Sequence, residues 1–223
     1  MKHSILPPSS AARRVACPGS RALEALYPSG ESESSREGEA AHWVAAYALT
    51  DEFLNKPVPE FTPGGELITD EMKEGALLYR NTIINRRKFI TYGSAVLHIE
   101  EKLDLSCLHP DAWGTPDCWF GHYLDNALYV VDYKFGHKFV EVFENWQLIA
   151  YAAGALELIR ASGCDHPPDL KIHMAIVQPR SFHKDGPVNT WTISHKNLLP
   201  YIERLRAAEF ESMQPVANCI PNP

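Results

Sequence analysis

Long apolar runs are lacking in this chain of 223 residues. No run approaches the roughly 20 apolar residues that a helix needs to cross a bilayer. The N-terminal stretch "MKHSILPPSSAARRVACPGS" also lacks the continuous apolar core of a secretion signal. We therefore expect a soluble, cytoplasmic protein with no membrane partner.

Cysteine is scarce, and no two cysteines are spaced as a C-x-x-C pair. The odd number of five argues against a disulfide framework, and the wide spacing argues against a zinc knuckle. We expect reduced thiols at all five positions, which are Cys17, Cys107, Cys118, Cys164 and Cys219.

Positive charge is not in excess, because the formal net charge is −7 at pH 7. This balance excludes a protein coated with positive charge for non-specific nucleic-acid binding, but it leaves room for a local basic groove. Two short basic clusters are either solvated surface charge or contacts to phosphate groups. They consist of Arg13, Arg14 and Arg21, and of Arg86, Arg87 and Lys88.

The residues that are present predict one globular domain of mixed α/β class. The chain is 45% hydrophobic and long enough to bury a full core. Apolar periodicity predicts helices first, then a meander of strands, and then a helix, two strands and a closing helix. The expected helices span 37–54, 66–88, 143–160 and 195–213, the last broken or started at Pro200, and the expected strands span 94–106, two segments within 114–134, 170–178 and 188–194.

Two aspartates interrupt the pair of strands within "GTPDCWFGHYLDNALYVVDYK" (114–134). If the turn is centred between Leu124 and Asp125, antiparallel pairing puts Asp117 directly across from Asp132. A turn slipped by one residue makes the contact diagonal. The period of two along a strand also places Asp132 and Lys134 on the same face.

Two opposed carboxylates beside the apolar "ALYVV" repel each other and are partly desolvated. A divalent cation between them would remove the repulsion, and Mg²⁺ prefers carboxylate oxygens. In the alternative interpretation Lys134 pairs with one aspartate while the other faces water.

The order of these residues resembles the PD-(D/E)XK nuclease signature. Pro116-Asp117 is followed after fourteen residues by Asp132-Tyr133-Lys134. The next helix carries Q-x-x-x-Y, and an upstream helix carries E-x-x-H, as in the RecB-like branch of that superfamily. The segments "PSSAARRVACPGS", "EGEAAH", "GTPDCWF", "VVDYKFG" and "NWQLIAYAAGAL" are further similar to a phage and bacterial group of RecB-like nucleases, over roughly residues 8–160.

The resemblance implies a restriction-endonuclease-like core, with a mixed central sheet flanked by helices. The expected single domain has an N-terminal helical part (1–90), a catalytic sheet core (94–196) and a C-terminal helix and tail (197–223).

The resemblance also implies a set of site residues. The implied metal ligands are His42, Asp117, Asp132 and the backbone carbonyl of Tyr133. The implied catalytic residues are Asp117, Asp132, Lys134, Gln147 and Tyr151, with Glu39 and Glu101 as possible supporting residues.

The implied activity is hydrolysis of DNA phosphodiester bonds with Mg²⁺ or Mn²⁺, by an exonuclease acting on DNA ends in phage-type recombination or repair. The expected partners are linear double-stranded DNA with free ends and a recombination protein, in the host cytoplasm if a phage encodes the chain. No iron–sulfur cluster is expected, because Cys17 precedes the core but only Cys164 and Cys219 follow the Q-x-x-x-Y helix.

Two other classes of function are open at this point. One is a nuclease-like DNA-binding or regulatory module without activity, against which the intact Asp117, Asp132 and Lys134 speak. The other is a carboxylate-bridged di-iron bundle using Glu39 and His42, which would need a second E-x-x-H on another predicted helix. None of the predicted helices has one.

Overall fold

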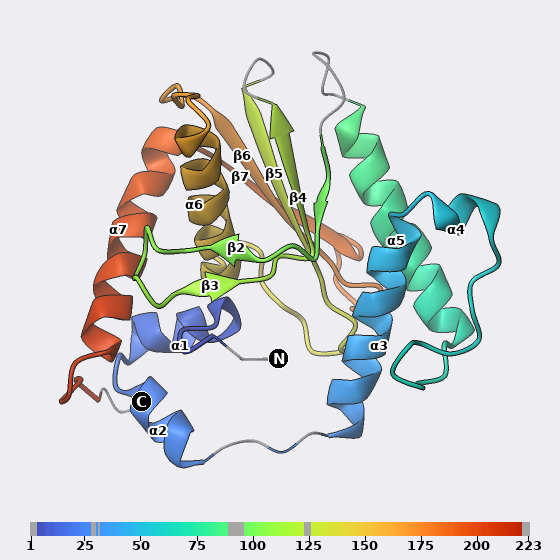
Figure 1. Cartoon of the computed structure of the whole chain (residues 1–223), viewed down its shortest axis with the longest axis horizontal. Coiled ribbons are helices and arrows are strands. Elements are labelled where there is room, and N and C mark those ends of the chain that lie inside the picture. Colours follow the sequence, from blue (N-terminus) through green and yellow to red (C-terminus); the bar gives the residue numbers. More distant parts are fainter. Residues whose placement is uncertain (1–3, 28–29, 31, 89–95, 123–125, 220–223) are drawn as a thin grey trace.

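A computed structural model describes residues 4–27, 30, 32–88, 96–122 and 126–219. Within these ranges a five-stranded mixed sheet lies between two layers of helices (Figure 1). The predicted mixed α/β class, with a central sheet flanked by helices, is confirmed.

The strand order in the sheet is β1-β4-β5-β6-β7, and only the β5–β6 pair is parallel. The central strands β5 and β6 are apolar runs, as expected for strands covered on both faces. A second, two-stranded sheet pairs β2 with β3. The strands are β1 (His98–Ile99), β2 (Leu103–Asp104), β3 (Trp113–Gly114), β4 (Cys118–His122), β5 (Ala127–Tyr133), β6 (Lys171–Val177) and β7 (Val188–Ser194).

One face of the sheet is covered by α3 (Glu33–Ala48) and α5 (Asp70–Arg87) (Figure 1). Ser32 and Thr69 cap these helices by accepting hydrogen bonds from backbone N–H groups of the first turn. Alanines on α3 pack with the buried side chains of β4 and β5. The short α4 (Glu52–Asn55) follows α3.

The other face is covered by α6 (Trp146–Ala161) and α7 (His195–Ser212), with the N-terminal segment packed beside them (Figure 1). Asn145 caps α6 through its side-chain oxygen. Helix α6 forms the crossover between the parallel strands β5 and β6. The N-terminal segment consists of η1 (Pro8–Ser10), α1 (Ala11–Ala16) and α2 (Ser20–Leu26).

Three predicted elements differ from the structure. The single strand expected over 94–106 is wrong in its described part, where residues 100–102 separate β1 from β2 and Glu100 has a φ of 50°. The helix expected over 37–54 ends at Ala48 and resumes as α4.

The third difference is at Pro200, which neither starts nor breaks α7. Pro200 removes one backbone hydrogen bond, to the carbonyl of Lys196, and both residues are exposed to water there. The predicted turn between Leu124 and Asp125 falls outside the described residues.

No helix in the described part of the chain is both long and apolar enough to span a bilayer. Cys107, Cys118, Cys164 and Cys219 are free thiols, and Sγ of Cys17 lies 3.9 Å from the carbonyl oxygen of Asn218.

Candidate active site

Asp117 lies directly before β4, at the end of the sheet where β5 finishes. Cys118 is opposite Val131, and continuing this register by one residue puts Asp117 beside Asp132, as predicted. The Oδ2 atom of Asp117 accepts a hydrogen bond from the backbone N–H of Tyr133, at 2.6 Å. The Asp117 side chain therefore links the start of β4 to the end of β5.

His42 reaches Asp117 from α3, on one face of the sheet. Its Nδ1 lies 3.1 Å from Oδ1 of Asp117, and its ring meets the ring of Tyr133 edge to face at 5.5 Å. Burial alone would lower the pKa of His42, but the charge and hydrogen bond of Asp117 outweigh it and raise this pKa to about 9. In turn, the pKa of Asp117 is lowered: burial opposes the shift, but His42, Lys134 and the Tyr133 N–H stabilise the carboxylate.

Asp132 is more deeply buried, with 3% of its side chain exposed. Lys134 Nζ lies 2.9 Å from Oδ2, and Gln147 Nε2 donates a hydrogen bond of 3.1 Å to Oδ1. Burial raises the pKa of Asp132, Lys134 opposes the rise, and the neighbouring Asp117 adds to it. Burial would lower the pKa of Lys134, but the two aspartates raise it, so Lys134 is an ammonium ion at neutral pH.

Tyr151, one turn after Gln147 on α6, acts on the segment that precedes Asp117. Its hydroxyl donates a hydrogen bond of 3.1 Å to the carbonyl of Thr115. At Gly114 a Cβ atom would lie 2.8 Å from the Tyr151 ring and 2.7 Å from Pro8, so only glycine permits this close approach. Gln147 contacts Asp132 directly, whereas Tyr151 contacts the site through the backbone two residues before Asp117.

Glu100 lies beside Asp117 and His42, whereas the adjacent Glu101, the predicted supporting residue, contacts His98 instead. Donor atoms of His42, Glu100 and Asp117 all lie within 4.8 Å of one another. The Glu100 backbone N–H bonds to the Asp117 carbonyl at 3.2 Å, and burial together with Asp117 raises the pKa of the Glu100 carboxyl to about 7. Glu101 is exposed, and its carboxylate lies 2.8 Å from Nδ1 of His98.

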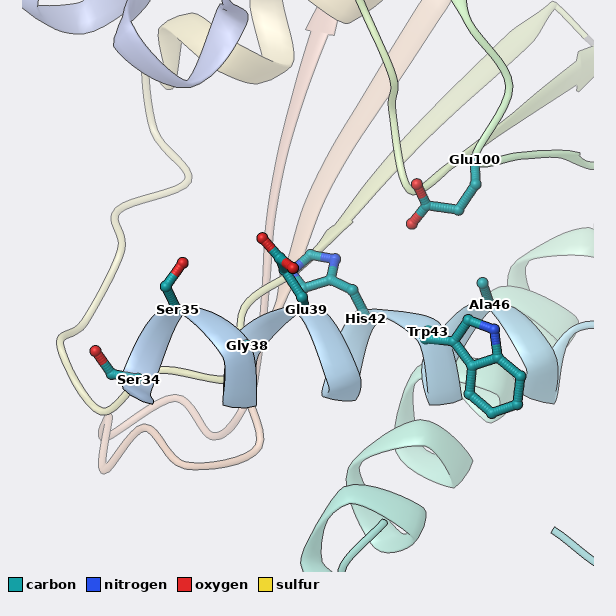
Figure 2. Close-up of a pocket in the computed structure, with 8 residues that line it drawn as sticks. All are labelled: Ser34, Ser35, Gly38, Glu39, His42, Trp43, Ala46 and Glu100. Atoms are coloured by element: carbon teal, nitrogen blue, oxygen red, sulfur yellow. The ribbon is translucent and has the colours of Figure 1, made fainter. Parts of the chain in front are cut away.

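A cavity of about 730 Å³ opens beside His42 on the α3 side. Figure 2 shows Glu39 and His42 on the same side of α3, with Glu100 coming from the opposite wall. Glu39 thus lines the cavity one turn before His42. The cavity wall therefore carries the carboxylates of Glu39 and Glu100 and the imidazole of His42, next to Asp117.

The donor set fits a divalent cation. Carboxylate oxygens suit Mg²⁺, and a mixture of carboxylate and imidazole ligands also suits Mn²⁺. Among the described residues the compact cluster consists of His42, Glu100 and Asp117, without Asp132. Nothing in the contacts of the Tyr133 carbonyl tests its predicted role as a ligand.

The predicted basic residues do not gather around this cluster. Arg14 is 1% exposed and forms a two-pronged ion pair with Glu209, so the prediction that Arg14 binds DNA is wrong. Arg13 pairs with Glu24, and Arg21 donates to the carbonyl of Ser212. Arg86, near the end of α5, donates a hydrogen bond of 2.7 Å to Oγ1 of Thr190 on the edge strand β7, and Lys88 Nζ donates to Asn85.

A family model described as "Protein of unknown function (DUF2800)" matches residues 3–222. The chain belongs to this family. Its description assigns no activity, so the chemistry has to be inferred from the residues of the site.

Two solved structures are similar to the chain at 14% sequence identity. One is an alkaline exonuclease from Laribacter hongkongensis, with a TM-score of 0.34 over 92% of this chain and 85% of that chain. The other is a phage-related exonuclease from Haemophilus somnus 129PT, with a TM-score of 0.31 over 95% of this chain and 94% of that chain. Neither likeness is close enough to assign an activity to this member of the DUF2800 family.

Two features of the site were not predicted from the sequence. The Tyr133 backbone N–H donates a hydrogen bond to Asp117, and the Tyr133 ring meets the His42 ring edge to face. The family resemblance implied a role only for the Tyr133 carbonyl. Glu100 was missed because the family resemblance pointed to the adjacent Glu101, and because Glu100 has a positive φ that strand alternation does not anticipate.

Proposed function

We propose that the chain is a divalent-metal-dependent deoxyribonuclease that hydrolyses phosphodiester bonds, acting as an exonuclease on the ends of linear DNA. The observation that carries this proposal is a pair of neighbouring aspartates with different partners: Asp117 faces His42, and Asp132 faces Lys134. An acidic ligand set next to a protonated amine is what metal-assisted attack on a phosphodiester requires.

His42, Glu100 and Asp117 would hold the ion, with Asp132 and the Tyr133 carbonyl as further ligands. A bound Mg²⁺ or Mn²⁺ ion supplies Lewis acidity toward the phosphate and lowers the pKa of the attacking water. The Tyr133 N–H fixes the direction of the Asp117 carboxylate, which supports its role as a ligand that needs little rearrangement.

Lys134 would stabilise negative charge that develops on the phosphate. Its side chain is 27% exposed, so the ammonium group can be reached by a phosphate while Asp132 holds it in position. One such preorganised contact contributes roughly 3 to 4 kcal/mol to the transition state.

Gln147 and Tyr151 would position these groups. Gln147 donates to the Asp132 oxygen that Lys134 also contacts, and so fixes the carboxylate between two donors. Tyr151 holds the Thr115 carbonyl and with it the backbone that leads into Asp117. Processing of DNA ends in phage-type recombination or repair, with a recombination protein as partner, would be a setting in keeping with the motif order.

The test is incubation of the purified chain with end-labelled linear, closed-circular and single-stranded DNA, in Mg²⁺, Mn²⁺ or EDTA. Linear DNA should be degraded with either metal, while closed circles and all EDTA samples stay intact. Cleavage of closed circles would contradict the need for ends, and cleavage in EDTA would contradict the metal dependence. DNA binding without cleavage under every condition would favour an inactive DNA-binding module. An Asp132→Asn protein purified in parallel reveals any contaminating nuclease.

A further inference from the structure

A second cavity, of about 540 Å³, lies beside Lys134 and Gln147. Its other lining residues are Trp146 at the start of α6, residues of the N-terminal segment around Ser9, and residues of the loop between β5 and α6, 136–145. We call the latter the 136–145 loop. Strand β5, which carries Asp132, therefore leads through Lys134 into this loop.

A buried glutamine gives the 136–145 loop a defined shape. Gln178 is 1% exposed, and its Nε2 donates to the carbonyls of Gly136 and Lys138, at 2.8 and 2.6 Å. Its Oε1 accepts a hydrogen bond from the N–H of Val140, at 3.1 Å. Three hydrogen bonds to one buried side chain hold the first half of the loop against the end of the sheet.

The acidic residues of the loop are engaged in holding its second half. The Glu141 carboxylate accepts hydrogen bonds from the N–H groups of Val142 and Phe143. The Glu144 carboxylate accepts a hydrogen bond of 2.7 Å from the Tyr201 hydroxyl. These contacts therefore fix the backbone from which Lys138 and two phenylalanines project.

Those two phenylalanines offer exposed ring faces beside the cavity. The ring of Phe139 is stacked on the imidazole of His183, with centroids 4.4 Å apart and planes inclined by 9°, and the residue is 36% exposed. Phe143 is 57% exposed and packs against the edge of Trp191 at 5.4 Å. Each ring is thus held by a second aromatic ring but keeps surface free for another stacking partner.

We propose that the 136–145 loop binds an unpaired DNA strand beside the scissile phosphate, with bases stacked on Phe139 and Phe143 and phosphates near Lys134 and Lys138. This inference rests on the proposed nuclease function and names the form of its substrate at the site. Single-stranded DNA is favoured because stacking on a protein ring needs a base face that a duplex does not expose. Stacking of this kind tolerates any base, so binding should not depend on sequence.

The test measures binding of a short fluorescein-labelled oligothymidylate by anisotropy in EDTA, where no cleavage occurs. The Phe139→Ala, Phe143→Ala double variant should bind at least about fivefold more weakly than the wild type, since loss of one stacked base costs about 5- to 150-fold in affinity. The matched control is Phe210→Ala. Phe210 is 45% exposed and lies against the ring of His109 at 4.7 Å, but it does not line this cavity. The control should bind like the wild type.

A second measurement distinguishes a loss of base stacking from damage to the metal site. Mn²⁺ affinity and melting temperature of the double variant should stay at the wild-type values. Equal oligothymidylate affinity in the double variant and the wild type would overturn the proposal, as would a loss of strand affinity equal to a loss of Mn²⁺ affinity. If the wild type binds the strand through these rings but neither binds Mn²⁺ nor cleaves DNA, the nuclease function fails while the strand-binding surface stands.

Discussion

The two sides of the aspartate pair differ in chemistry. On the α3 side, His42, Glu39 and Glu100 line a cavity of about 730 Å³ next to Asp117. On the side of α6 and the 136–145 loop, Lys134 and Lys138 line a cavity of about 540 Å³ together with two exposed phenylalanine rings. The first side suits a cation, and the second suits a phosphate chain with its bases. The border between them is where we place the scissile phosphate.

The same contrast divides the two aspartates. The pKa of Asp117 is lowered because His42, Lys134 and a backbone N–H outweigh its burial. The pKa of Asp132 is raised because burial and the nearby Asp117 outweigh Lys134. Asp117 is thus stabilised as a carboxylate by its neighbours, whereas Lys134 is the main group that stabilises the carboxylate form of Asp132. One pair of carboxylates serves two purposes because the two faces of the sheet supply different neighbours.

The largest effect is expected from removal of the Lys134 charge, on the side of α6 and the 136–145 loop. Lys134→Ala should lower DNA cleavage by about 10²- to 10³-fold, because it deletes a donor to the developing charge. Metal binding, followed as a Mn²⁺-induced rise in melting temperature, should persist because the cluster on the α3 side is intact. Lys73→Ala, which removes an exposed lysine paired with Asp70, is the control and should cleave normally. Near-normal cleavage by the Lys134 variant would contradict the contrast between the two sides.

The next largest effect is expected on the α3 side. His42→Ala should weaken Mn²⁺ binding by about 10- to 100-fold, and excess Mn²⁺ should restore part of the cleavage. The metal-free protein should also lose some stability, because Asp117 loses its ion pair with His42, so the metal dependence is the decisive readout. The measurement is a Mn²⁺ titration that follows cleavage rate and melting temperature together. A packed core histidine would behave differently, with a loss of about 1 to 3 kcal/mol in stability and normal metal dependence.

The smallest effect separates two adjacent glutamates. Glu100→Gln should lower Mn²⁺ affinity by about tenfold, the lower end of the range for groups around a metal, because Glu100 lies in the cluster with His42 and Asp117. Glu101→Gln should leave the affinity unchanged, since Glu101 faces His98 in solvent. Calorimetric titration of both proteins with Mn²⁺ gives the comparison. The opposite ranking would support the role that the family resemblance implied for Glu101.

Much of the fold could be predicted from periodicity. The strands β6 and β7 and the helix α6 lie within a few residues of the expected ranges, because their patterns are long and regular. The register that sets Asp117 beside Asp132 also followed from the hairpin pattern. Short irregular elements could not be predicted in this way. The strands β1 and β2 have two residues each, and Glu100 between them has a backbone conformation that alternation does not anticipate.

The site was predictable where a motif is local in sequence. Asp132, Lys134 and Gln147 are close in the chain, and they are in contact in the structure. The approach of His42 to Asp117 across 75 residues was suggested by the resemblance alone and is seen as a 3.1 Å contact. The burial of Arg14 was not predictable, because its partner Glu209 is 195 residues away and no local pattern links the two.

The measurement that tests the central claim most directly is the Mn²⁺-induced rise in melting temperature of the wild type and of an Asp117→Asn, Asp132→Asn double variant. If the two carboxylates share a cation, metal at 100 times its dissociation constant stabilises the wild type by about 2.7 kcal/mol through mass action. The double variant should then show no rise, whatever its melting temperature without metal. An identical metal-induced rise in both proteins would contradict the account, because the cation would then be bound at a place other than the Asp117 and Asp132 carboxylates.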